Sequence, residues 1–95
     1  MTVTKLDGIA VKLPGGGLFP PMDVFVNFRL VQSSNVDRVG WDFAGNTYVG
    51  FTNGTMYVYY GTSRQRAVAA AYSKSVGRYI NTKLKDCYQV LKIGS

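Results

Sequence analysis

An Asn-Gly pair between two strand-like segments constrains the fold more than any other feature of the sequence. Asn53-Gly54 separates two runs of β-branched and aromatic residues, which span residues 47–52 and 55–60. Because both residues tolerate a positive φ, the pair favours a two-residue type I′ turn, whose twist matches that of the flanking strands. The pattern therefore predicts a β-hairpin over residues 47–60, in which Phe51 faces Met56 and Val49 faces Val58.

This register assigns the side chains of the hairpin to two faces, since side chains alternate along a strand. One face would carry Val49, Phe51, Met56 and Val58, and the other would carry Tyr48, Tyr57 and Tyr59. A small two-layer domain must bury one sheet face beneath its helices. The tyrosines are thus either core residues under the helices or a platform on which nucleobases stack.

Further strands are expected on both sides of the hairpin, at residues 24–31, 36–41 and 87–93. The first of these places Val24, Val26, Phe28 and Leu30 on one face. It follows a loose alternation over residues 3–13 with a turn at Asp7-Gly8, a flexible glycine-rich loop at residues 14–17 and an extended segment at residues 19–21. The strand at residues 24–31 either extends the sheet or serves as an arm in a homo-oligomer. We favour the arm, because such an apolar edge strand would otherwise aggregate.

Residues 64–84 have the spacing of an amphipathic helix. Apolar residues recur three and four positions apart at Ala67, Val68, Ala71, Tyr72, Val76, Tyr79 and Ile80. Val68, Tyr72, Val76 and Tyr79 would form the buried side, opposite Lys74 and Arg78. Thr62 or Ser63 can cap the start, and Gly77 predicts a division into two helices. The expected fold is a small α+β domain: an antiparallel sheet around the central hairpin, with one or two C-terminal helices on one face.

The net charge of +6 comes entirely from the last third of the chain. Residues 1–63 contain as many acidic as basic residues, whereas residues 64–95 contain seven Lys and Arg against a single Asp. Such a segment is either a solvated helix face or a surface for an anionic partner, which could be nucleic acid, a nucleotide or an acidic protein. The candidate nucleic-acid-binding residues are Arg64, Arg66, Lys74, Arg78, Lys83 and Lys85 for phosphates, with Tyr57 and Tyr59 for bases.

The composition argues against catalysis. The chain has no His, no Glu and one cysteine, Cys87, so a Cys-His or Ser-His pair within one chain is excluded. Its five Asp residues have no spacing typical of an acid–base pair or a metal site. We expect no catalytic residue, cofactor or metal. We also expect an intracellular, cytoplasmic protein without a membrane anchor, because no apolar run has the length of a membrane span and the start lacks a signal-peptide core.

Several short motifs occur in an order typical of one family. They are Ser34 and Val36, Gly40-Trp41-Asp42, Phe51-Thr52-Asn53-Gly54, Tyr57-Val58-Tyr59, Ser75-Val76-Gly77-Arg78-Tyr79-Ile80-Asn81, Leu84 and Tyr88. Together they resemble the KTSC domain, which occurs at the C-terminus of some lysyl-tRNA synthetases and as a free-standing small protein in bacteria and phages. Trp41 stands where the family usually has Tyr or Phe, and residues 61–64 replace a frequent Val-Pro. The resemblance divides the chain into an extension, residues 1–33, and a KTSC-like domain, residues 34–95.

RNA binding is the function proposed for that family. The leading expectation is accordingly a non-catalytic module that binds RNA or single-stranded nucleic acid through its basic helix. One alternative is a homo-oligomeric protein-interaction module, such as a bacterial or phage adaptor or inhibitor, built through the N-terminal strand. Another is a sponge for a small anionic nucleotide, held at the helix start by Arg64.

Overall fold

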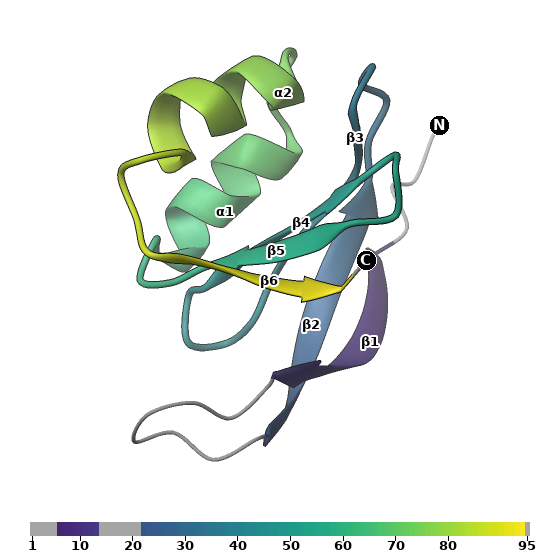
Figure 1. Ribbon diagram of the computed structural model, residues 1–95, viewed down its shortest axis with the longest axis vertical. Helices are drawn as coiled ribbons and strands as arrows, with labels where there is room; N and C mark the ends of the chain where they lie inside the picture. The colour runs from purple at the N-terminus through teal and green to yellow at the C-terminus, as the bar shows by residue number, and fades with distance from the viewer. Residues whose placement is uncertain (1–5, 14–21, 95) are drawn as a thin grey trace.

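The computed structural model describes residues 6–13 and 22–94, which form a helical layer on a curled antiparallel sheet (Figure 1). The six strands are β1 (Leu6–Leu13), β2 (Met22–Leu30), β3 (Val36–Trp41), β4 (Thr47–Phe51), β5 (Met56–Tyr59) and β6 (Val90–Gly94). Between β5 and β6 the chain forms α1 (Arg64–Ala71), α2 (Val76–Tyr79) and a π-helical turn, η1 (Ile80–Leu84). This confirms the α+β class. The glycine-rich loop and the extended segment expected at residues 14–17 and 19–21 lie outside the described residues.

The sheet is a simple meander, in which each strand pairs with its neighbours in the sequence. The strand expected at residues 36–41 is found with these bounds as β3, and the last expected strand is found slightly later, as β6. Neither α-helix of the described chain is long and apolar enough to cross a membrane.

The central hairpin forms, but the predicted register is wrong by one residue. Tyr48 pairs with Val58 rather than with Tyr59. The Phe51 amide donates to the Thr55 carbonyl at 2.8 Å, and the Gly54 amide donates to the Phe51 carbonyl at 3.0 Å, so the loop has three residues. Gly54, with φ of 92°, takes the left-handed position of such a loop. The three-residue loop replaces the two-residue turn expected from the Asn-Gly pair. Each side chain of β5 therefore lies on the sheet face opposite to the predicted one.

The corrected register places the three tyrosines on two different faces of the sheet. A first core between the sheet and the helices contains Tyr59, with Tyr57 at its edge. Tyr48 is fully buried in a second core on the opposite face. The expectation that the three share one face is therefore wrong. The second core is enclosed by the curl of the sheet, since Leu13 of β1 and Ile93 of β6 both pack against it.

β1 and β2 form a hairpin that continues the chain's own sheet. β2 pairs with β1 along its length and with β3 through residues 27–30, so it is an interior strand. Asp7-Gly8 lies within β1, and the turn expected there is wrong. Val24, Val26 and Phe28 are buried together as predicted, whereas Leu30 is 62% exposed. Oligomer formation through this extension stays a prediction.

Gly40 makes room for an aromatic pair in the second core. It pairs with Phe28 on β2 and with Tyr48 on β4, and these two rings meet edge to face with centroids 6.3 Å apart. A Cβ at Gly40 would lie 2.6 Å from Cδ1 of Phe28 and 2.8 Å from the backbone oxygen of Asn27. Packing therefore requires a glycine at this position.

α1 packs on the sheet through small side chains. Its buried residues are Ala67, Ala70 and Ala71, while Tyr72 is half exposed, so the predicted stripe through Tyr72 is wrong for this helix. Alanines lie at the interface because they allow the helix to approach β3 and β4 closely. Ser63 caps the helix as expected, since its hydroxyl accepts the Arg66 amide at 3.3 Å. The expected division into two helices is also found, with α2 starting at Val76.

Candidate nucleic-acid interface

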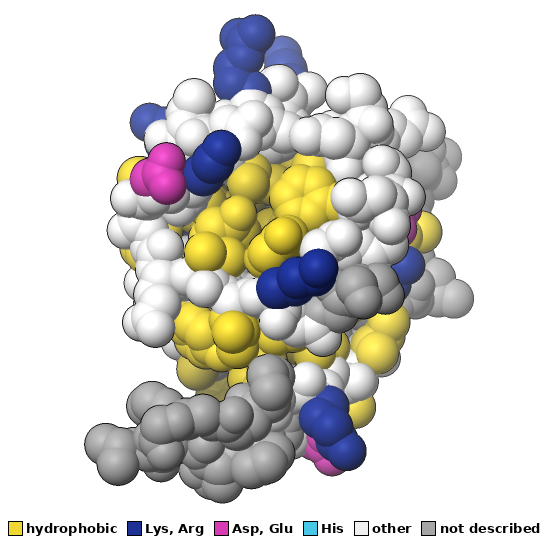
Figure 2. All heavy atoms as spheres, in the orientation of Figure 1, with side chains coloured by type: hydrophobic (Ala, Val, Ile, Leu, Met, Phe, Trp, Pro, Cys, Tyr) yellow, Lys and Arg dark blue, Asp and Glu magenta, His cyan; other side chains and the backbone are white. Residues whose placement is uncertain are grey.

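The basic residues of the last third belong to the helical layer and the segment that follows it. Arg66 is half-buried, and the other five candidates are exposed: Arg64, Lys74, Arg78, Lys83 and Lys85. Within residues 6–13 and 22–94, the only ion pair joins Nη2 of Arg38 to the Asp37 carboxylate at 3.3 Å. None of the six candidate cations is therefore neutralised by a carboxylate of the described chain. On the face shown in Figure 2, basic side chains lie around a hollow lined by hydrophobic ones.

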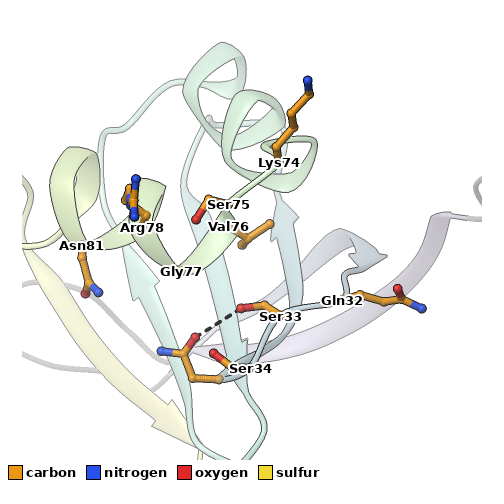
Figure 3. A pocket seen from close by; sticks show the side chains of 10 residues that line it. Gln32, Ser33, Ser34, Lys74, Ser75, Val76, Gly77, Arg78 and Asn81 are labelled. Carbon is orange, nitrogen blue, oxygen red and sulfur yellow. Dashed lines mark hydrogen bonds between the residues drawn. The ribbon is translucent and has the colours of Figure 1, made fainter.

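Lys74 and Arg78 flank a polar pocket of about 490 Å³ at the start of α2. The connection between β2 and β3 forms one wall, and the first residues of α2 form the other. The remaining lining residues are Gln32, Ser33, Ser34, Asn35, Ser75, Val76, Gly77 and Asn81. In Figure 3, Ser75 points toward the β2–β3 connection, whereas Lys74 extends away from it. The lining thus offers hydroxyl, amide and cationic groups, and no carboxylate of the described residues belongs to it.

Gly77 lets the two walls of this pocket approach each other closely. A Cβ at Gly77 would lie 2.8 Å from Oδ1 of Asn35 and 3.6 Å from Oγ of Ser33. Those two side chains are themselves joined, because the Ser33 hydroxyl donates to Oδ1 of Asn35 at 3.2 Å (Figure 3). Within the described part of the chain, Ser75, the N-cap residue of α2, makes no capping hydrogen bond through its side chain. Its hydroxyl is therefore available to a ligand in the pocket.

A second, smaller hollow of about 360 Å³ lies along α1. It is lined by Ser63, Gln65, Arg66 and Ala69 of the α1 segment and by Tyr79 of α2. Tyr79 directly follows Arg78, which flanks the first pocket, so α2 contributes one residue to each hollow. The structure thereby brings Arg66, Arg78 and Lys74 onto adjoining parts of one layer, with Arg64 at its start. Lys83 and Lys85 lie apart from both hollows, at the end of η1.

The structure separates the two candidate tyrosines from these hollows. Tyr59 is only 7% exposed, and burial raises the pKa of its hydroxyl, with smaller contributions from Tyr57 and Asp86. Tyr57 is half-buried and packs edge to face against Phe51, with ring centroids 5.8 Å apart. Because a base needs a free ring face on which to stack, Tyr59 is not suited to that role in this structure.

A buried polar cluster holds the turn between β3 and β4. The carboxylate of Asp42, which is 2% exposed, accepts hydrogen bonds from the Asn46 amide at 3.0 Å and from the Tyr48 hydroxyl at 2.8 Å. Burial, and then this bond to Asp42, raise the pKa of Tyr48 far above its usual value. Asp42 thus organises the turn. Among the described residues, no three acidic, Cys or His side chains gather as a metal site would require.

A family model of the KTSC domain matches residues 32–88. The chain belongs to the KTSC domain family. No curated protein matches it. The KTSC match begins at Gln32, the first residue that lines the polar pocket, and it leaves the β1–β2 hairpin outside.

The motifs that carry the KTSC resemblance separate into two structural groups. Gly40-Trp41-Asp42 and Tyr57-Val58-Tyr59 contribute mainly to the two cores and to the buried polar cluster. Ser34, Ser75, Gly77 and Asn81 line the polar pocket. Of the residues that line the polar pocket, only Lys74 and Arg78 are among the candidates predicted from the sequence, because those candidates were chosen by their charge. The available signal was a glycine that interrupts a helical pattern between Ser75 and Arg78, which often marks a close approach.

Proposed function

We propose that this KTSC protein is a non-catalytic module that binds single-stranded nucleic acid, RNA in particular. The observation that carries the proposal is the polar pocket in which Lys74 and Arg78 accompany hydroxyl and amide side chains without a carboxylate. Lysine and arginine contact phosphates, while serine and asparagine can bind phosphate oxygens, sugars or base edges. The pocket therefore offers partners both for the charged phosphate of a nucleotide and for its uncharged sugar and base.

A single strand fits this surface better than a duplex. Sequence-specific RNA binding mostly uses bases that are unstacked and turned out of a helix, and such bases enter pockets. The pocket volume of about 490 Å³ lies in the range of small-ligand sites. The adjoining hollow with Arg66 and Tyr79 offers a cation and an aromatic ring for the next part of the strand. Lys83 and Lys85 contribute to the general attraction of phosphates.

The experiment is a titration of the full chain into labelled single-stranded RNA, single-stranded DNA and an RNA duplex of equal length. Affinity for the single strands should exceed that for the duplex and fall steeply between about 50 and 200 mM salt. Lys74→Glu and Arg78→Glu should each weaken binding. Each should also reduce the slope of the logarithm of the binding constant against the logarithm of salt concentration by about one, the value for one lost phosphate contact.

Lys12→Glu is the matched control, because it makes the same change in net charge at an exposed position on β1. It should have a much smaller effect than either pocket substitution. If the three substitutions weaken binding equally, net charge alone is responsible, and the pocket is not the site. If the unchanged protein fails to bind at low salt, nucleic-acid binding is itself refuted.

A free nucleotide is a second candidate ligand, because the pocket is large enough to hold one without a polymer. Its test is the melting temperature of the protein with a panel of mononucleotides. A ligand that binds only the folded state raises that temperature with concentration. Stabilisation by a mononucleotide, together with weak polymer binding, would favour this function over the first.

A further inference from the structure

Phe43 is the most exposed large hydrophobic residue of the described chain. Its relative exposure is 96%, on the turn that joins β3 to β4. Single exposed hydrophobic residues are common on protein surfaces. Phe43 differs from such residues because the turn that carries it is firmly held.

Three hydrogen bonds to one buried side chain fix the Phe43 turn. The Asp42 carboxylate accepts from the backbone amide and the side-chain amide of Asn46, both at 3.0 Å, and from Tyr48 at 2.8 Å. The Gly45 amide also donates to the Asp42 carbonyl at 3.2 Å. Because its backbone is tied on both sides, Phe43 is presented to solvent in a restricted position.

The same turn packs against the segment that enters α1. Asn46 Oδ1 accepts the Gly61 amide at 3.0 Å, and the Thr62 hydroxyl donates to the Gly45 carbonyl at 2.8 Å. A Cβ at Gly45 would lie 3.2 Å from the backbone nitrogen of Arg64, so the two segments are in contact. Figure 1 shows the β3–β4 turn and the start of α1 on the same side of the molecule, at the left of the view. Phe43 and the exposed Arg64 therefore lie at one end of the helical layer.

We propose that Phe43 is a stacking platform for an unpaired base and that Arg64 contacts the phosphate next to it. This inference rests on the proposed function, and it gives the bound strand a contact beyond the two hollows. An exposed aromatic ring beside a cation is the arrangement that single-strand-binding proteins use, since every base has a π-face and every nucleotide a phosphate. Phe43 has a free ring face, which Tyr59 lacks, so the aromatic contact is assigned to a different part of the chain.

The test measures affinity for a labelled single strand and for a base-free polyphosphate. Phe43→Ala should weaken binding to the single strand by about 5- to 150-fold, the range found for the loss of one stacked base. Phe43→Trp and Phe43→Tyr should preserve the affinity, while Phe43→Leu should lose as much as the alanine variant. None of these substitutions should change binding to polyphosphate, because it has no bases. All four should keep the unfolding midpoint, since the side chain is exposed.

Phe25→Ala is the matched control, because Phe25 is 62% exposed but lies on β2, outside the helical layer. It should change affinity less than twofold. If Phe43→Leu binds as well as the unchanged protein, the contact is merely apolar and the stacking proposal is refuted. If Phe43→Ala keeps full affinity while Lys74→Glu and Arg78→Glu lose it, only the role of Phe43 is refuted. A protein that binds no single strand at all refutes the proposed function as well.

Discussion

Nη1 of Arg29 donates a hydrogen bond of 2.9 Å to the backbone carbonyl of Ala71, the last residue of α1. The same guanidinium lies over the ring of Tyr72, with its carbon 4.3 Å from the ring centre. A cation at the end of a helix is favourable because the unpaired carbonyls there carry partial negative charge. Arg29 thereby ties β2, which lies outside the KTSC match, to a helix inside it.

The first prediction concerns this link. Arg29→Ala should lower the free energy of unfolding by about 1–3 kcal/mol, because a charged hydrogen bond and a cation–π contact are both lost. Arg29→Met should cost less, since it keeps the aliphatic stem and removes Nε, which is buried without a hydrogen-bond partner among the described residues. Urea unfolding measures the change, with Arg64→Ala as an exposed arginine control. Equal stability of Arg29→Ala and the unchanged protein would show that the contact adds nothing.

The second prediction concerns the aromatic pair over β3. Gly40→Ala should destabilise the protein by about 1–3 kcal/mol, because the added methyl group meets backbone as well as the Phe28 ring. Thermal and urea unfolding should both report the loss. A variant as stable as the original would mean that β2 and β3 can move apart without cost.

Stability should fall in alkaline solution, because Tyr48 and Tyr59 have raised pKa values in the folded state. Unfolded tyrosine ionises near pH 10, so the unfolded state loses its protons first and is favoured as the pH rises further. The contribution of Tyr48 is fully present below about pH 10 and is lost as the pH rises toward its folded pKa. Tyr48→Phe should be less stable at pH 8, and its deficit should shrink by pH 11. The measurement is the free energy of unfolding of both proteins in urea as a function of pH. A difference between them that stays constant from pH 8 to pH 11 would contradict the prediction.

Gly77→Ala should separate binding from stability. The added methyl group displaces the Asn35 side chain and fills part of the polar pocket, so affinity for single strands should fall several-fold. Stability should stay the same or rise by up to about 1 kcal/mol, because alanine favours helix more than glycine. Gly54→Ala is the converse control: its φ of 92° makes it destabilising, yet it lies outside the pocket and should keep full affinity. Full affinity in Gly77→Ala would exclude the pocket from the interface.

The family match should not fold when it is isolated. A chain that starts at residue 32 lacks Val24, Val26 and Phe28, which are buried in the second core. Each such loss costs about 1–5 kcal/mol, and a whole domain is stable by only about 5–15 kcal/mol. Circular dichroism should therefore show no cooperative melting for residues 32–95. A cooperative transition near that of the full chain would show that the hairpin is dispensable.

Much of the fold is predictable from local patterns, because strands, helix caps and turns depend on neighbouring residues. Ser63 and the runs around Asn53-Gly54 gave correct elements for this reason. The register was not predictable in the same way, since an Asn-Gly pair also fits a three-residue loop with Gly54 in the left-handed position. That single choice decides which tyrosines lie under the helices.

The candidate site was harder to predict than the fold. The pocket joins Ser33 and Asn35 to Gly77, which are about forty positions apart in the sequence, so no local pattern reveals their contact. Charge identified Lys74 and Arg78 correctly as exposed residues, but it does not indicate the uncharged groups between them. The exposure of Phe43 was not predicted, because a lone aromatic residue in a turn has no periodic pattern.

The order of the strands has a consequence for how the chain folds. Five strands form a continuous meander, so each can join the sheet as soon as it follows its neighbour. β6 differs, because it reaches β5 only after the segment of α1, α2 and η1. Closing a longer loop costs more chain entropy and slows the contact that it delays. We therefore expect β6 to pair last, and a chain still emerging from the ribosome to expose the edge of β5 until residues 90–94 are free to pair with it.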